Sequence, residues 1–192
     1  MRVARSELIL GAEAAGKMAR AEALAQAWVA AQPGRRAVYV DTAQGWDSQM
    51  RALIERHRDG SGAGGRMITV EEPTELAHAL GAHSRPDTLI VVDCLTFWLT
   101  ATLMQALEPD HSGDFSASDH ARPPVRMFDA VRACAGPLVL VSHQLHVAPA
   151  IGRHDLNALL DTLDTLDQQA VGACERVTLM SAGMPLTLKE VA

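Results

Sequence analysis

The fold of this chain is indicated by the stretch Gly11-Ala12-Glu13-Ala14-Ala15-Gly16-Lys17. It matches the G-x-x-x-x-G-K pattern of a phosphate-binding loop, or P-loop. In such a loop the glycines let backbone N–H groups face the phosphates, and the lysine pairs with the β- and γ-phosphate oxygens. The chain has 14 glycines and only two lysines, and their random placement yields about 0.01 such matches. The stretch therefore predicts a binding site for a nucleoside triphosphate.

The residue after this stretch departs from the pattern. Serine or threonine normally follows the lysine and holds Mg²⁺ through its hydroxyl, but Met18 stands there. A carboxylate can hold the metal from the other side. The apolar run at residues 89–92 predicts a buried strand, and Asp93 follows it directly. Asp93 is thus the predicted metal ligand, and a cap for the helix that follows is a compatible second role.

The segments around this loop alternate between strands and helices. Short apolar runs predict strands at residues 6–10, 37–41, 67–70, 88–92 and 137–141. Pattern and composition predict helices at residues 19–31, 47–58, 73–82, 95–107, 125–134 and 155–174. Residues 59–66 and 108–124 predict loops, and residues 177–188 predict two strands that turn at residues 181–183. This order predicts an α/β fold: a P-loop NTPase-like, mostly parallel sheet with helices on both faces and a C-terminal β-hairpin.

The composition excludes several classes of protein. With 192 residues, of which 48% are hydrophobic, the chain is predicted to form a single P-loop nucleotide-binding domain over residues 1–192. Its net charge of −6 arises from basic and acidic residues that are mixed along the chain, so we expect no nucleic-acid partner. The longest apolar run, residues 89–99, is interrupted by Asp93 and is far shorter than the roughly 20 residues that span a membrane.

Two features predict a cytoplasmic protein. Residues 1–11 lack the long apolar core and the cleavage site of a secretory signal. Cys94, Cys134 and Cys174 are odd in number and far apart, which predicts buried free thiols instead of disulfides. Both observations favour a reducing compartment.

Several segments resemble, in their order and spacing, the bifunctional adenosylcobinamide kinase / adenosylcobinamide-phosphate guanylyltransferase family of cobalamin synthesis. They are LILGAEAAGK at 8–17, RALIERHRDG at 51–60, TVEEP at 69–73, VDCLTFWLT at 92–100 and LDQQAVGACERVTLMSAGMPLTLK at 166–189. The resemblance implies Mg²⁺ with GTP or ATP, a cobinamide-type acceptor and a homo-oligomer. The predicted nucleotide-binding residues are Gly11, Ala12, Glu13, Ala14, Ala15, Gly16, Lys17, Met18, Glu71 and Asp93.

The resemblance places His57 at the position that becomes covalently guanylylated. A neutral imidazole is a competent nucleophile near neutral pH, so His57 is the predicted catalytic residue. Its attack on the α-phosphorus of GTP would give a GMP-histidine intermediate, which a cobinamide phosphate then takes up. The kinase half would first phosphorylate the aminopropanol hydroxyl of adenosylcobinamide. Without the resemblance, His57 is a helix-end histidine favoured by the helix dipole.

The chain also departs from the pattern of this family. Ala14 stands where the family usually has arginine, and Asp167 where it has asparagine. After Ser142 the family continues Asn-Glu-Val-Gly, whereas this chain reads His143-Gln144-Leu145-His146. Asn157 and Leu160 replace two expected arginines. Loss of these cations weakens a pocket for an anionic substrate.

Two hypotheses follow from these departures. The chain is a working but divergent enzyme of the family, or it is a non-catalytic nucleotide-binding relative with a regulatory or assembly role. His143, His146 and His154 offer a metal site as a further alternative. Because no cysteine or acidic partner stands at ligand spacing, we expect these histidines to line a pocket or the surface.

Overall fold

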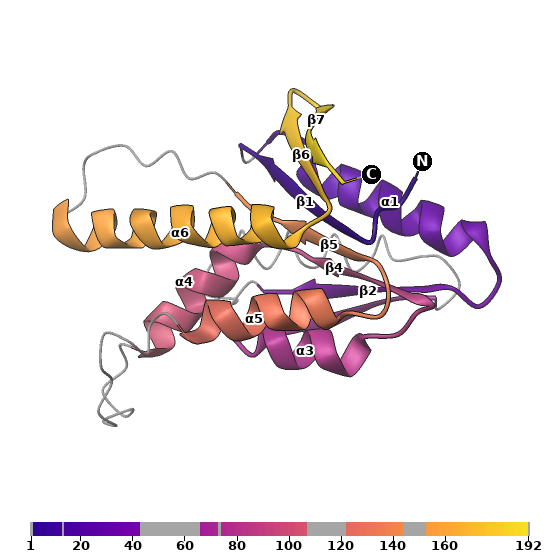
Figure 1. Ribbon diagram of the computed structural model, residues 1–192, viewed down its shortest axis with the longest axis horizontal. Helices are drawn as coiled ribbons and strands as arrows, with labels where there is room; N and C mark the ends of the chain where they lie inside the picture. Colours follow the sequence, from indigo (N-terminus) through magenta and orange to yellow (C-terminus); the bar gives the residue numbers. More distant parts are fainter. Residues whose placement is uncertain are drawn as a thin grey trace.

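The computed structural model describes residues 2–12, 14–42, 66–72, 74–106, 122–143 and 153–191. Seven strands form one sheet in the order β3-β2-β4-β5-β1-β6-β7. The strands are β1 (Ser6–Gly11), β2 (Arg36–Asp41), β3 (Met67–Glu71), β4 (Thr88–Val92), β5 (Leu138–Val141), β6 (Arg176–Ser181) and β7 (Met184–Glu190). Six are parallel, and β7 pairs antiparallel with β6 (Figure 1). The predicted mostly parallel sheet with a C-terminal β-hairpin is confirmed.

Helices lie on both faces of this sheet, as predicted. The described helices are α1 (Lys17–Ala31), α3 (Leu76–His83), α4 (Leu95–Ala106), α5 (Arg122–Ala133) and α6 (Arg153–Ala173). Helix α1 packs on one face, where Leu24 and Val29 join an apolar cluster with Ile9 of β1. The other four helices contribute to the larger apolar cluster of the opposite face (Figure 1). The central strands β4 and β5 are buried along their whole length, which explains their uninterrupted apolar sequences.

A buried carboxylate lies in the apolar interior beside the phosphate-loop strand's partners. Glu7 of β1 is buried, and its Oε1 accepts hydrogen bonds from Arg20 Nε and Thr178 Oγ1, each at 2.8 Å. Its Oε2 lies 3.6 Å from Nη1 of Arg176, which also pairs with Glu190. We call these five residues the Glu7 cluster. The cluster joins β1, α1, β6 and β7, so it links the phosphate-loop elements to the C-terminal hairpin.

Two helix starts differ by three residues from the sequence prediction. Helix α3 begins at Leu76, not at residue 73, because the Glu72 carboxylate accepts the backbone N–H groups of Thr74 (3.3 Å) and Glu75 (2.8 Å) and stabilises a turn first. Helix α5 begins at Arg122, inside the loop predicted at 108–124. Prolines 123 and 124 fall in its first turn, where a missing N–H costs no helical hydrogen bond. The helix predicted at 47–58 lies outside the described residues, as do residues 59–65 and 108–121 of the predicted loops.

The C-terminal hairpin forms one edge of the sheet. Nζ of Lys189 on β7 donates to the carbonyl oxygens of Val171 (2.7 Å) and Cys174 (2.8 Å), which caps the end of α6. The outer strand β7 exposes Met184, Leu186 and Leu188 to solvent. None of the helices in the described ranges has the length and apolar character needed to cross a membrane.

Candidate nucleotide site

The predicted phosphate loop joins the end of β1 to the start of α1. Gly11 (φ 148°) and Gly16 (φ 90°) have backbone conformations that favour glycine. A Cβ atom at Gly11 would lie 2.6 Å from the carbonyl oxygen of Met180, so a larger residue there would force β6 to move. Because α1 begins at Lys17, the N–H groups of its first turn face the loop, where they can bind an anion.

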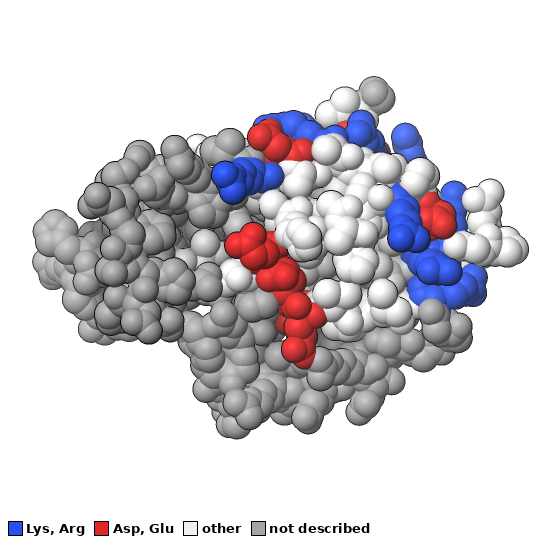
Figure 2. All heavy atoms as spheres, turned by 90° about the horizontal axis from the view of Figure 1, so that it is seen from below, with Lys and Arg blue, Asp and Glu red and all other residues white. Residues whose placement is uncertain are grey.

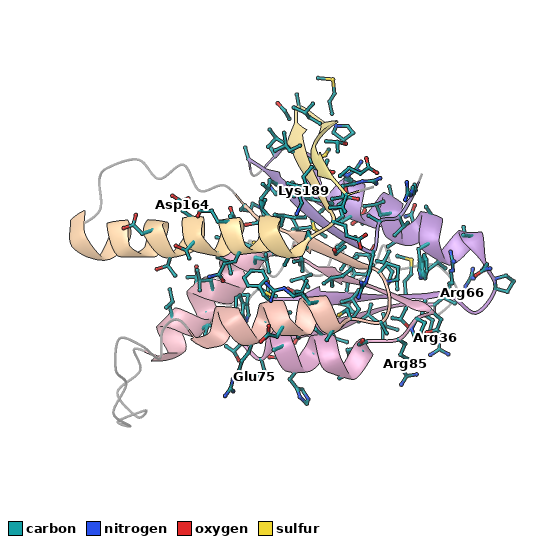
Figure 3. The ribbon with its side chains drawn as sticks, viewed as in Figure 1. Arg36, Arg66, Glu75, Arg85, Asp164 and Lys189 are labelled. Carbon is teal, nitrogen blue, oxygen red and sulfur yellow. The ribbon has the colours of Figure 1, made fainter. Side chains whose placement is uncertain are left out.

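Lys17 lies beneath this loop. Its side chain is buried, and Nζ donates to the carbonyl oxygens of Gly11 at 2.8 Å and Ala12 at 2.5 Å. The second lysine of the chain, Lys189, caps α6 at the far side of the hairpin (Figure 3). The two lysines therefore have different roles, and Lys17 is the one whose charge lies at the phosphate loop.

The turn of the β6–β7 hairpin contacts the phosphate loop. The backbone N–H of Gly183 donates to the carbonyl oxygen of Ala15 at 3.1 Å, and the N–H of Ala15 donates to Ala12 O at the same distance. A Cβ on Gly16 would lie 3.4 Å from Cα of Gly183. The turn was predicted from the sequence, but this contact was not, because no local pattern connects residues so far apart along the chain.

The other residues of the predicted loop differ in exposure. Ala12 and Ala14 are exposed, Ala15 is buried, and Glu13 lies outside the described residues. Met18, at the position of the expected hydroxyl, is half-buried and packs against the apolar cluster of the α1 face. Its side chain therefore serves packing at the place where related loops bind a metal ion.

Three strands end at or beside a carboxylate at their carboxyl ends, on the same side of the sheet as the phosphate loop. Asp41 ends β2 and is buried, Glu71 ends β3 opposite it in register and is exposed, and Asp93 directly follows β4. The N–H of Asp93 donates to Val40 O at 3.0 Å, which ties β4 to β2 at this level. Within the described ranges, no group of three or more His, Cys, Asp or Glu side chains is arranged to hold a metal ion. The assignment of Asp93 as metal ligand stays a prediction.

Three arginines lie near the amino ends of the strands. Arg36, Arg66 and Arg85 gather near the amino ends of the strands, whereas Glu75 lies toward the other end (Figure 3). A band of acidic side chains also crosses the face seen from below, and basic side chains lie at the right and along the top of this view (Figure 2). These arginines are thus remote from the phosphate loop.

A second polar group lies where β4 and β5 end. The hydroxyl of Thr96 donates to the carbonyl oxygen of His143 (3.1 Å) and accepts the N–H of the same residue (3.2 Å). Ser142 Oγ donates to Oδ1 of Asp167 at 2.7 Å and lies 3.4 Å from Thr96 Oγ1. Nδ1 of His143 lies 3.0 Å from Sγ of Cys94. We call these five residues the Thr96 cluster.

Two acidic groups of the Thr96 cluster have shifted pKa values. Burial, and secondarily the charge of Asp93, raises the pKa of the Cys94 thiol to about 12, so the sulfur keeps its proton at neutral pH. Burial also raises the pKa of Asp167, although the hydrogen bond from Ser142 opposes this shift. From the sequence, Asp167 was noted as a departure from a family pattern, and His143 as a departure and as a member of the alternative metal site. Their connection through Ser142 and Thr96 depends on tertiary packing, which no local signal reveals.

A family model described as cobinamide kinase / cobinamide phosphate guanyltransferase matches residues 7–188. The chain belongs to this family. The bifunctional adenosylcobalamin biosynthesis protein CobP of Pseudomonas aeruginosa is 34% identical over 95% of this chain and 96% of that protein. The bifunctional adenosylcobalamin biosynthesis protein CobU of Escherichia coli is 26% identical over 95% of this chain and 98% of that protein. The resemblance found in the sequence is confirmed.

Some of the predicted site residues and of the positions where this chain departs from the pattern of the cobinamide kinase / guanyltransferase family lie in the described residues, and others do not. The phosphate loop, Asp41, Asp93 and His143 all lie at the carboxyl edge of the sheet. Asn157 and Leu160 lie within α6. The predicted nucleophile His57 is outside the described residues, and so are Gln144 and His146.

Proposed function

We propose that this chain transfers the terminal phosphoryl group of a nucleoside triphosphate to the hydroxyl of a cobinamide, and then transfers GMP to the cobinamide phosphate. Membership of the family supports this class of reaction. The structural observation that carries the proposal is the glycine loop with Lys17 beneath it at the start of α1. Phosphoryl and nucleotidyl transfer depend mainly on positioning and on neutralisation of phosphate charge, which a helix N-terminus and a lysine supply.

Replacement of Lys17 tests the nucleotide site. Lys17→Ala should weaken binding of GTP or ATP by about 1.5–3 kcal/mol, because charge-assisted contacts to the phosphates are lost. Isothermal titration calorimetry measures this loss. Lys189→Ala is the matched control, since it removes the only other lysine and leaves the loop intact. Equal affinity of Lys17→Ala and the wild type would remove this loop as the nucleotide site.

We further propose that Mg²⁺ accompanies the nucleotide and is bound by Asp93, phosphate oxygens and water. Met18 supplies no hard oxygen, so magnesium should contribute less to binding than in a loop that carries a hydroxyl there. Met18→Ser should therefore increase the dependence of GTP affinity on magnesium. Met18→Ala is the control, because it loses the same packing against the α1-face cluster without adding a hydroxyl. If the two variants respond alike to magnesium, the missing hydroxyl is not what limits the metal.

His57 is proposed as the nucleophile that attacks the α-phosphorus of GTP, releases pyrophosphate and forms the GMP-histidine intermediate. Mass spectrometry after incubation with GTP and Mg²⁺ should detect a GMP adduct on the wild type that is absent from His57→Ala. An adduct that persists in His57→Ala would move the nucleophile to another residue. Absence of any adduct over a range of nucleotide and metal concentrations would favour the alternative function, a non-catalytic nucleotide-binding relative with a regulatory or assembly role.

We infer that the chain acts as one nucleotide-binding domain in a cytoplasmic homo-oligomer. The three cysteines are free and buried, which suits a reducing compartment. The apolar side chains Met184, Leu186 and Leu188 on β7 favour assembly, because an exposed apolar edge strand is a ready surface for another chain. Sedimentation velocity tests the assembly: Leu186→Lys should shift the protein toward the monomer, and a wild type that is monomeric at all concentrations would contradict it.

A further inference from the structure

His143 leaves the sheet beside the phosphate loop. Strand β5 lies between β1 and β4, and Ile9 of β1 pairs with Val141 of β5. The N–H of Ser142 still donates to Ile9 O at 3.0 Å, so the parallel register continues to the residue before His143. Two residues beyond each member of this pair are Gly11 and His143. Because neighbouring strands lie about 4.8 Å apart, the backbone of His143 is at the level of the first loop residue and one strand away.

The position of His143 is held by contacts at its backbone and its ring. Its backbone N–H and C=O both bond the buried hydroxyl of Thr96. Its imidazole is half-buried, with Nδ1 at 3.0 Å from Cys94 Sγ and the ring centroid 5.6 Å from that of Phe97. A side chain held in this way has little rotamer freedom left to lose when a ligand binds.

The contact with Cys94 favours one tautomer of the imidazole. Cys94 is a free thiol that lies 3.0 Å from Nδ1, so its S–H can donate to this nitrogen. A neutral ring that accepts at Nδ1 carries its own proton on Nε2. The opposite arrangement would use sulfur as the acceptor, but Sγ already accepts the backbone N–H of Phe97 at 3.4 Å, and a thiol sulfur is a weak acceptor. In this tautomer the ring donates through Nε2–H, and a phosphate oxygen is a hydrogen-bond acceptor that can receive this donor.

We propose that His143 binds the terminal phosphoryl group of the bound nucleoside triphosphate through its Nε2–H donor. The proposal rests on the proposed function, since it adds a residue to the same nucleotide site. Lys17 contacts Gly11 O, and in a phosphate loop this lysine pairs with the β- and γ-phosphates. His143 stands one strand away from Gly11, on the side of β4 and Asp93, so it adds a donor where a terminal phosphate would meet the acceptor substrate.

A pair of amide variants separates the two nitrogens of the ring. The amide of His143→Gln reaches the position of Nε2, whereas the shorter amide of His143→Asn reaches only that of Nδ1. In the phosphotransfer assay with adenosylcobinamide, His143→Asn should lower kcat/KM for the nucleotide roughly 10- to 100-fold, the range for loss of a hydrogen bond to a charged group. His143→Gln should retain most of the activity. Equal losses in both variants, or better retention by His143→Asn, would overturn the proposal and leave the ring as a packing partner of Cys94.

A spectroscopic test does not depend on turnover. With ¹⁵N-histidine-labelled full-length protein, the Nε2–H resonance that disappears in His143→Asn should shift when a non-hydrolysable triphosphate analogue binds, and not when the diphosphate binds. The same response to both nucleotides, or no response, would overturn the contact with the terminal phosphate. If the shift is seen but the wild type transfers no phosphoryl group, the proposed function fails and the assignment of His143 stands.

Discussion

One buried polar cluster includes Glu7 of the phosphate-loop strand β1 and extends to β6 and β7, while a second lies where β4 and β5 end, and the two are built from different chemistry. The Glu7 cluster is ionic: one carboxylate, 1% exposed, faces two arginine side chains that are 11% exposed. The Thr96 cluster consists of hydroxyls, a thiol, an imidazole and one carboxylate whose pKa is raised. The first cluster joins four elements of the fold, while the second fixes one histidine beside the phosphate loop. We therefore expect the Glu7 cluster to govern stability and the Thr96 cluster to govern function.

The largest effect on stability should come from Glu7. Glu7→Ala leaves Arg20 and Arg176 without their buried partner, and the loss of one member of a buried ion pair costs about 3–5 kcal/mol. Urea unfolding measures this loss in the free energy of unfolding. Glu190→Ala is the control, because it removes the exposed partner of the same Arg176 and should change stability little. If the two variants have the same free energy of unfolding, burial of the ion pair is not the reason why this cluster stabilises the fold.

Replacement of Thr96 should have a smaller effect on stability and a larger one on function. Thr96→Val removes the hydroxyl that bonds both backbone groups of His143, at a cost of about 1–3 kcal/mol for the unsatisfied groups. Thr100→Val is the matched control, since Thr100 Oγ1 only bonds the carbonyl of Thr96 within helix α4. At a temperature where all variants are folded, phosphotransfer should fall for Thr96→Val and not for Thr100→Val. An active Thr96→Val would erase the contrast between the two clusters.

The smallest effect is expected at Asp167 and depends on pH. Because burial raises its pKa above 3.8, the folded chain binds more protons than the unfolded chain between 3.8 and the raised value. The free energy of unfolding therefore falls as pH rises through this window. Asp167→Asn keeps an acceptor oxygen for Ser142 and removes the titration, so it should be more stable than the wild type at pH 7, with a difference that shrinks as pH falls toward 3.8.

The control for this pH dependence is Asp161→Asn, which changes an exposed carboxylate on the same helix. Urea unfolding at several pH values measures both variants. If Asp167→Asn were less stable than the wild type at pH 7, the charge of Asp167 would be favourable in the fold. The Thr96 cluster would then resemble the ionic Glu7 cluster.

Local sequence signals predicted the elements and failed for the contacts between them. Strand β4 was predicted at its observed bounds, since five consecutive apolar or β-branched residues suit a strand buried on both faces. The loop ending in Lys17 was found because glycine and lysine are required there by conformation and charge. Glu7, in contrast, was hidden inside an apolar run, and its partners Arg20 and Arg176 come from distant segments. The roles of Ser142 and Thr96 likewise arise from packing of β5 against α4 and α6, which periodicity does not encode.

Because Gly183 N–H donates to Ala15 O, the exchange of this amide at the tip of the hairpin depends on the order of the phosphate loop. Hydrogen exchange at this single amide should slow when nucleotide orders the loop, even though Gly183 lies at the other end of the chain. Coupling between two sites is reciprocal in free energy. A partner that binds the exposed strand at Met184 and stiffens the turn should therefore tighten nucleotide binding by some factor. Bound nucleotide should then tighten binding of that partner by the same factor. Binding at the phosphate loop and binding at the outer strand β7 would then be thermodynamically coupled through the turn.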